Sequence, residues 1–161
     1  MRAITFAAGC AAFALLAAPA GAADPKQKPP YWASIGAAKA RMRTGPGRTY
    51  PASWLYVRPD LPVRVTAVYK EWRKVQDPGG TEGWMLANLL SSTRTAFVPS
   101  GPVELRERPG GTAKVIWRAA PGVVGKLSAC ADGWCQLDVH GQKGFVEQGR
   151  LWGTETGEAV P

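Results

Sequence analysis

The chain has 161 residues and a formal net charge of +8, from 20 Lys and Arg side chains and 12 Asp and Glu side chains. That length suits one ordinary domain or two very small ones. The basic balance favours anionic partners such as cell-wall polymers, phospholipid head groups or acidic proteins, or it serves solubility alone. No nucleic acid is expected as a partner, because an export signal begins the chain and no run of Lys and Arg reaches the length of a nucleic-acid-binding arm.

The first 22 residues differ in composition from the rest of the chain. Arg2 precedes an apolar run over residues 3–18, and Pro19 and three small residues follow it. This order is typical of a secretory signal peptide over residues 1–22, with cleavage near Ala22 or Ala23. A retained membrane anchor needs about 20 apolar residues and the run is shorter, so we expect no stable membrane insertion of the mature chain. The sequence therefore predicts a periplasmic or secreted protein.

Residues 23–30 are polar and rich in proline, which predicts a linker, and the first folded unit is expected over residues 31–98. Alternation of apolar and polar residues predicts the strands of this unit at 31–36, 40–43, 63–68, 71–76 and 83–85. Thr44-Gly45-Pro46-Gly47 predicts a tight turn in which both glycines can adopt positive φ. Prolines at positions 51, 59 and 62 exclude a helix between that turn and the third strand, so we expect an irregular loop carrying Tyr50, Trp54 and Tyr56. A single helical turn at 88–91 is expected to close the unit.

A second unit, residues 99–153, repeats the first in altered form. The aligned residues are Arg43 with Arg106, Trp54 with Trp117, Trp72 with Trp134, and Gly83-Trp84 with Gly144-Phe145, at a spacing that drifts only from 63 to 61 residues. So constant a spacing indicates a duplicated unit. Each copy has a size at which only about 60% of the unfolded surface is buried, so we expect the two units to lean on each other.

The second unit is expected to contain strands at 103–106, 123–130, 133–139 and 144–146, a loop through Trp117 and a closing turn at 149–152. Residues 95–98 form a possible further strand, and residues 154–161 are polar and predict a flexible tail. Helical periodicity is absent outside the signal peptide. The sequence therefore predicts an all-β protein with a small, partly open barrel in each unit.

Short motifs keep a fixed order in both units. In the first they are Met42-Arg43-Thr44-Gly45-Pro46-Gly47, Tyr50-Pro51, Leu61-Pro62-Val63, Trp72-Arg73-Lys74-Val75, Gly83-Trp84 and Leu89-Leu90-Ser91. The second has Leu105-Arg106, Pro121-Gly122, Cys130, Trp134-Cys135, Gly144-Phe145 and Leu151-Trp152-Gly153, and departs from the first where Arg108 replaces Gly45. This order resembles the bacterial SH3-like domain family in its tandem exported proteobacterial form, over residues 31–153. The resemblance implies two tandem small SH3-like β-barrels, an envelope location, and binding of cell-wall peptides or partner proteins without catalysis.

Two cysteines, Cys130 and Cys135, remain after signal cleavage, in an oxidising compartment. They flank a predicted turn between adjacent strands, where a disulfide fits and would stabilise the fold by roughly 2 kcal/mol. A metal-binding or redox pair is the alternative, although no third or fourth metal ligand lies at suitable spacing. Cys135 and His140 suggest a nucleophile and base, but five residues along a strand place them on opposite faces and about 16 Å apart.

Other catalytic signals are weak. The pairs Glu104 with Glu107 and Asp132 with Asp138 lie at surface strands or turns without an apolar setting that would raise a pKa. No esterase, metalloprotease or phosphate-binding motif is present in the sequence. We therefore expect no enzyme activity, no cofactor and no metal.

Aromatic side chains are the best candidates for ligand binding, because SH3-like barrels bind extended peptides in aromatic-lined grooves. The candidates are Tyr50, Trp54, Tyr56 and Trp72, and the residues that could supply charge for an acidic partner are Arg43, Arg48, Arg58, Arg73 and Lys74. Tyr50 and Trp72 are expected to be partly exposed. In the alternative interpretation Trp54 and Trp84 fill the barrel core and the arginines form only a solvated face.

The leading hypothesis is a non-catalytic envelope protein that recognises peptide, either a peptidoglycan stem or a protein segment. A second hypothesis is a structural or inhibitory partner in an envelope complex, which makes contact through the face between the units. A third, an envelope hydrolase, rests only on the Cys135 and His140 pair.

Overall fold

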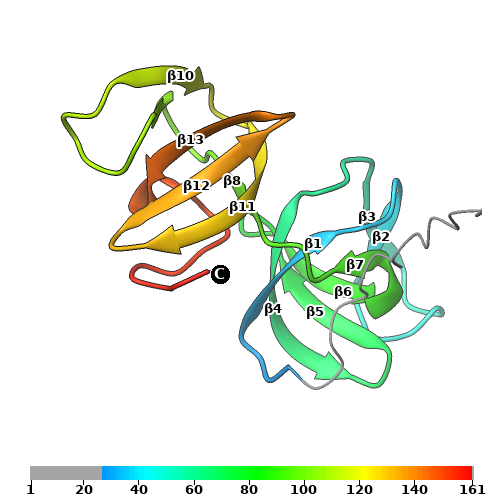
Figure 1. Ribbon diagram of the computed structural model, residues 1–161. Coiled ribbons are helices and arrows are strands. Elements are labelled where there is room, and N and C mark those ends of the chain that lie inside the picture. The colour runs from blue at the N-terminus through cyan, green and yellow to red at the C-terminus, as the bar shows by residue number, and fades with distance from the viewer. Residues whose placement is uncertain (1–26, 161) are drawn as a thin grey trace, which may run out of the picture.

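The computed structural model describes residues 27–160, so the predicted signal peptide lies outside the described residues. Two antiparallel sheets follow one another along the chain (Figure 1). The strands of the first sheet are β1 (Tyr31–Ile35), β2 (Ala40–Arg43), β3 (Ala52–Tyr56), β4 (Pro62–Tyr69), β5 (Trp72–Gln76), β6 (Glu82–Leu86) and β7 (Leu90–Ser91). A short 3-10 helix, η1 (Ala87–Leu89), joins β6 to β7. The strand order is β3-β2-β6-β5-β4-β1-β7.

The second sheet repeats this arrangement. Its strands are β8 (Thr95–Phe97), β9 (Val103–Arg106), β10 (Val115–Ala119), β11 (Val124–Ala131), β12 (Trp134–Val139) and β13 (Gln142–Glu147), followed by the 3-10 helix η2 (Gln148–Arg150). The order β10-β9-β13-β12-β11 matches β3-β2-β6-β5-β4 strand for strand. The prediction of an all-β chain with two tandem small barrels is confirmed. No helix in the described residues is long and apolar enough to cross a membrane.

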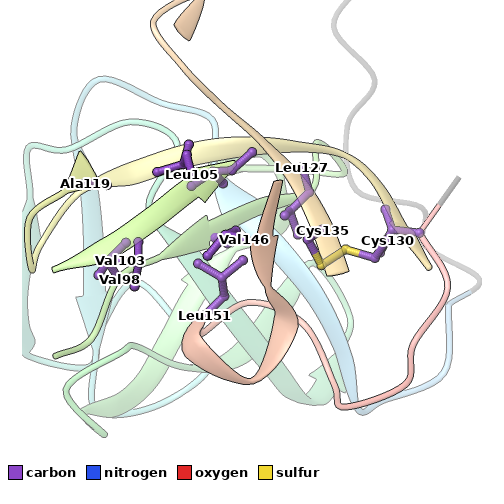
Figure 2. Packing of buried hydrophobic residues seen from close by; sticks show 12 residues of the cluster. Val98, Val103, Leu105, Ala119, Leu127, Cys130, Cys135, Val146 and Leu151 are labelled. Atoms are coloured by element: carbon purple, nitrogen blue, oxygen red, sulfur yellow. A yellow bond between two sulfur atoms is a disulfide. The ribbon is translucent and has the colours of Figure 1, made fainter. Parts of the chain in front are cut away.

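Each unit has its own hydrophobic core. Period-two alternation turns Met42, Val63, Val65, Val75 and Met85 inward in the first unit, where all five are fully buried. The core of the second unit contains Val98, Val103, Leu105, Ala119, Leu127, Val146 and Leu151 together with both cysteines (Figure 2). Each fully buried aliphatic side chain of this kind contributes about 1.5–3 kcal/mol. The two buried clusters are distinct, as a duplicated unit predicts, and Phe97 and Val124 of the second sheet pack against the first.

The duplication extends to individual packing contacts. A Cβ added at Gly83 would lie 2.3 Å from Cγ of Met42, and one added at the equivalent Gly144 would lie 2.7 Å from Cβ of Leu105. Met42 and Leu105 are themselves equivalent in the repeat. Each unit therefore requires glycine on this strand, β6 in the first unit and β13 in the second. The side chain of Met42 on β2, or of Leu105 on β9, fills the space that a Cβ would need.

The segment between the Gly45-Pro46-Gly47 turn and β4 is not the irregular loop that the prolines suggested. Residues 52–56 form β3, which pairs with β2 so that Met42 lies opposite Trp54. Pro51 and Pro59 lie just outside the strand, and Pro62 is the first residue of β4, so none interrupts a ladder of hydrogen bonds. The loop expected through Trp117 is likewise strand β10, which pairs with β9.

Residues 154–160, for which the sequence predicts a flexible tail, make defined contacts with the second unit. Val160 is buried and forms a β-bridge with Cys130. Arg94 forms an ion pair with Glu158 at 2.6 Å, and Gln148 donates a hydrogen bond to Thr154 at 2.9 Å. The polar residues of the tail therefore find partners within the protein, and one apolar side chain anchors the end.

Strand β8 belongs to the second sheet. Thr95–Phe97 pairs with β11, with Phe97 opposite Val124. The domain boundary expected after residue 98 therefore separates β8 from the strand with which it forms hydrogen bonds.

The two units contact each other, as their small size predicts. Trp32 and Trp152 meet edge to face with ring centroids 4.7 Å apart, and the Arg64 guanidinium lies 5.8 Å from the centre of the Trp32 ring. Arg64 also forms an ion pair with Glu155 at 3.1 Å. These contacts join β1 and β4 of the first unit to the segment that follows η2.

Candidate functional site

A groove lies on the outer face of the first unit, with a volume of about 410 Å³. We call it the first groove. Its lining residues are Lys39, Arg41, Arg43, Arg48, Leu55, Trp72, Leu86 and Leu89. The groove thus has an aromatic and aliphatic floor and a basic rim, without an acidic lining residue.

Strand alternation places these side chains together. In β2, Ala40 and Met42 are buried in the core, so Arg41 and Arg43 point to the opposite face. Leu55 of β3 lies opposite Arg41, and Leu86 of β6 lies opposite Trp72 of β5. The third residue of η1, Leu89, completes the floor.

Trp72 lines the groove but was expected to be more exposed. Only 4% of its surface is accessible. Trp72 therefore forms part of the groove floor, and its burial also stabilises the unit.

Arg73 lies outside the groove, contrary to its selection as a ligand-binding candidate. It alternates with Trp72 and points to the opposite side of β5, where it is only 3% exposed. Its Nε donates to Tyr31 Oη at 3.1 Å, and its Nη1 donates to the carbonyl oxygens of Lys70 and Trp72 at 2.9 and 3.1 Å. These bonds satisfy a buried cation, which gives Arg73 a structural role.

Arg43 lines the groove and also closes the loop beside it. Its Nη1 donates to the carbonyl oxygen of Tyr50 at 2.6 Å. The equivalent Arg106 donates to the carbonyl oxygen of Ala113 at 2.5 Å, again seven residues further along the chain. Since a guanidinium has five N–H donors, Arg43 retains donors that can face a ligand.

Tyr50 is 46% exposed, in agreement with the expectation of partial exposure. A Cβ at Gly45 would lie 2.3 Å from Cδ1 of Tyr50, so the aromatic ring occupies the space that a side chain there would need. Neither Gly45 nor Gly47 has positive φ, although the sequence suggested that the turn would use it. Glycine is needed at position 45 for space, not for backbone conformation.

Trp54 and Tyr56 differ in their surroundings. Trp54 is 58% exposed, so it does not fill the core as the alternative interpretation proposed. Tyr56 is partly buried, and its hydroxyl donates to Asp77 Oδ2 at 2.8 Å. Burial, the hydrogen bond to Asp77 and the charge of Asp77 raise the pKa of Tyr56 well above its usual range. Tyr56 therefore ties β3 to the turn after β5, and neither residue lines the first groove.

Sequence reasoning did not select five of the residues that line the groove: Lys39, Arg41, Leu55, Leu86 and Leu89. The signal for Arg41 was available, because alternation already turned it outward from β2. Leu55 was hidden because its strand was interpreted as a loop.

The second unit has a groove at the equivalent place, with a volume of about 300 Å³. We call it the second groove. Seven of its lining residues align in the repeat with seven of the first: Pro102 with Lys39, Glu104 with Arg41, Arg106 with Arg43, Arg118 with Leu55, Trp134 with Trp72, Glu147 with Leu86, and Arg150 with Leu89. Strand pairing supports the alignment, since Arg118 lies opposite Glu104 as Leu55 lies opposite Arg41.

The two grooves differ in their charge. In the second, Glu104 forms ion pairs with Arg106 at 2.6 Å and with Arg118 at 3.2 Å. In the first, none of the four cations forms an ion pair with any residue between 27 and 160.

The predicted disulfide between Cys130 and Cys135 is confirmed, and both residues are buried. They lie opposite each other on β11 and β12, which are joined by a two-residue turn with positive φ at Asp132 and Gly133. Cys135 therefore has no free thiol to act as a nucleophile with His140. Among residues 27–160, no group of three His, Cys, Asp or Glu side chains is arranged to bind a metal ion.

Comparison with protein families identifies the chain. The bacterial SH3 domain family matches residues 36–92 and residues 100–153. These two matches cover more than half of the chain, so the protein belongs to the bacterial SH3 domain family and carries two tandem copies of the domain. No curated protein matches the sequence.

Among solved structures, the chain is similar to NlpC1 from Trichomonas vaginalis, at 12% identity and a TM-score of 0.35 over 85% of this chain and 50% of that one. NlpC2 from the same organism matches at 11% identity and a TM-score of 0.35, over 79% of this chain and 49% of that one. An NlpC/P60 family protein from Bacillus cereus matches at 13% identity and a TM-score of 0.35, over 81% of this chain and 58% of that one. The chain thus spans about half the length of these proteins.

Proposed function

We propose that the protein is a non-catalytic binding protein of the bacterial cell envelope that recognises peptide through its SH3-like barrels. The peptide is a peptidoglycan stem or a segment of an envelope protein. The first groove carries this proposal, because an apolar floor that includes Trp72, with polar groups at the rim, is the form that extended peptide ligands require. Membership of the bacterial SH3 family supports it.

The proposed location is the periplasm or the cell exterior. The buried Cys130–Cys135 disulfide supports export, because disulfides persist in oxidising compartments. The apolar start of the chain, with its small residues near the expected cleavage site, supports the same location.

Co-sedimentation of the purified protein with isolated sacculi tests this function. We expect the wild-type protein to pellet with sacculi and the variant Leu89→Asp to remain largely in the supernatant, because a carboxylate would enter the apolar floor. A matched variant, Val57→Asp, changes a side chain that is 65% exposed and outside the groove, and should pellet as the wild type does. Wild-type protein that stays in the supernatant would contradict cell-wall binding.

A structural or inhibitory role in an envelope complex is a second candidate. The surface that favours it is strand β3 at one edge of the first sheet, rather than the face between the units that the sequence suggested. Trp54, Leu55 and Val57 are 58%, 50% and 65% exposed in and just after this strand. An exposed edge with apolar side chains can pair with a strand of another protein. If this alternative holds, the wild type does not bind sacculi but captures a partner protein. The variant Trp54→Ala would then lose that capture.

A further inference from the structure

Building on the proposed function, we propose that only the first groove takes ligand and that it recognises a carboxylate group of a peptide. The second groove is closed to such a ligand by its own glutamate. This inference rests on peptide recognition by the barrels.

The first observation is the uncompensated charge of the first groove. Lys39, Arg41, Arg43 and Arg48 converge on one cavity, and no acidic residue lines it. Four cations gathered in this way repel one another, and an anion placed among them relieves the repulsion. Arginine is the side chain best suited to bind a carboxylate, because its planar fork can donate two parallel hydrogen bonds.

The second observation comes from the repeat. Arg106, the equivalent of Arg43, donates a hydrogen bond to a carboxylate oxygen of Glu104 at 2.6 Å. Arg43 has no such neighbour, because the position equivalent to Glu104 is Arg41. The second unit thus shows that a carboxylate fits beside this arginine, and the first unit leaves the place to a carboxylate from another molecule.

The third observation is the floor of each groove. Leu55, Leu86 and Leu89 give the first groove an aliphatic surface, on which the carbon chain of a peptide can pack. The equivalent residues in the second groove are Arg118, Glu147 and Arg150. An apolar peptide segment would there displace water from charged groups, which is unfavourable.

These features distinguish a peptide from a free ion or a phosphate group. A basic rim alone would bind any anion. An aliphatic floor adds affinity only for a ligand that has apolar carbon atoms beside its charged group. Every stem peptide or protein segment with a free end has a terminal carboxylate, and acidic side chains supply others. We therefore assign the first groove to a carboxylate-bearing peptide.

The test uses the full chain and the variant Arg41→Glu, which copies the arrangement of Glu104 into the first groove. Arg41 is exposed, and its side chain forms no hydrogen bond or ion pair with any residue between 27 and 160, so the melting temperature should stay unchanged. We expect affinity for sacculi to fall about tenfold or more, as for loss of a charge-assisted hydrogen bond. The matched control is Arg108→Glu, which makes the same change of charge at a side chain that is 68% exposed outside both grooves.

The second arm compares untreated sacculi with sacculi whose carboxyl groups have been converted to amides. Binding to the untreated sacculi alone, lost in Arg41→Glu and kept in Arg108→Glu, would support the proposal. Equal binding to untreated and amidated sacculi, or equal binding by Arg41→Glu and Arg108→Glu, would overturn the carboxylate assignment. Recognition of the cell wall would still stand. Binding to phosphatidylglycerol vesicles that is lost in Arg41→Glu would also overturn the carboxylate assignment, in favour of phosphate.

A third arm separates this inference from the proposed function. The protein labelled with ¹⁵N is titrated with triglutamate and with triglutamine amide. If sacculi are not bound at all but triglutamate alone shifts the amide signals of Arg41, Leu55 and Leu89, the carboxylate site stands and cell-wall recognition fails. Absence of shifts, equal shifts with triglutamine amide, or equal shifts around Glu104 would overturn the site itself.

Discussion

Met42 and Leu105 occupy equivalent positions in the two units, and each covers a glycine on the strand beside it. At the residue scale, the repeat has preserved such contacts where the core is formed and has changed the side chains where the surface faces solvent. Arg43 and Arg106 keep the same hydrogen bond to the loop that follows. Arg41 and Glu104, two residues earlier on the same face, have opposite charge. The packing has therefore been retained in both copies while the charge of the groove-lining side chains has changed.

The packing at Gly83 gives a direct test at this scale. In Gly83→Ala, the new Cβ would lie 2.3 Å from Met42 Cγ and 2.9 Å from the carbonyl oxygen of Arg43, and the backbone atom cannot move aside without disturbing β2. We expect a loss of about 1–3 kcal/mol in the free energy of unfolding, measured in urea. Gly79→Ala is the control, because its Cβ would meet only Asp77 Oδ1, at an ordinary 3.4 Å. Equal stability of the two variants would refute the packing argument.

At the element scale, most strands follow from alternation, and the exceptions have identifiable causes. Strand β3 was missed because Pro51, Pro59 and Pro62 seemed to exclude regular structure, although proline is tolerated at the ends of strands. The contacts of the tail were missed because its polar composition gives no sign of the partners, Arg94 and Gln148, that lie far away in the chain. Such pairings depend on the fold and are not visible in local sequence.

The candidate site shows the same division between local and long-range information. The burial of Arg73 could be predicted, because Val75 two residues later is a core residue and the two share a face of β5. Arg43 lines the groove because it alternates with the buried Met42 along β2, a position that the sequence pattern already indicates. The convergence of Lys39, Leu55 and Leu89 could not be predicted, because it requires β3 to pair with β2 and η1 to pack beside them.

The contribution of the tail, residues 152–160, to the stability of the fold depends on pH. Burial acts to raise the pKa of Glu158, but hydrogen bonds from Arg94, the Glu155 N–H and Thr154, with the charge of Arg94, outweigh it and lower that pKa. A carboxylate with a lowered folded-state pKa stabilises the protein above its ordinary pKa, and this contribution is lost as the pH falls through the lowered value.

We therefore expect the stability of the wild type to fall more steeply between pH 7 and pH 3 than that of Glu158→Gln, which cannot titrate. The free energy of unfolding in urea at each pH measures this difference. Glu147→Gln is a matched control, because this exposed residue forms no ion pair with any described residue. Parallel pH profiles for the wild type and Glu158→Gln would show that the ion pair with Arg94 contributes nothing.

At the scale of the whole molecule, two small barrels support each other through contacts between the units, in which Phe97 and Val124 of the second sheet also pack against the first core. Trp32 and Trp152 meet edge to face, and Arg64 bridges Trp32 and Glu155. The tail that supplies Trp152 and Glu155 is also joined to Cys130 through Val160. The second unit therefore contributes to the position of the first, which is a role it can retain without binding ligand.

Calorimetry tests this mutual support. Trp152→Ala removes an aromatic pair worth about 0.5–1.5 kcal/mol beyond its buried area. We expect the wild type to melt in a single transition and Trp152→Ala to melt in two, with the first unit melting at the lower temperature. Trp117→Ala removes a tryptophan that is 45% exposed on strand β10 and should keep one transition. A single transition in both variants would show that the tryptophan pair does not couple the units.

The central claim is that two barrels of one ancestry now divide their roles, so that one binds peptide and the other does not. The stoichiometry of ligand binding measures this most directly. Soluble stem peptides released from sacculi are titrated into the full chain by isothermal calorimetry at low salt. The account predicts one peptide bound per chain, with an affinity that weakens as salt is added, because the anchoring interaction is electrostatic. Two peptides bound per chain with equal affinity, or affinity that does not change with salt, would contradict it.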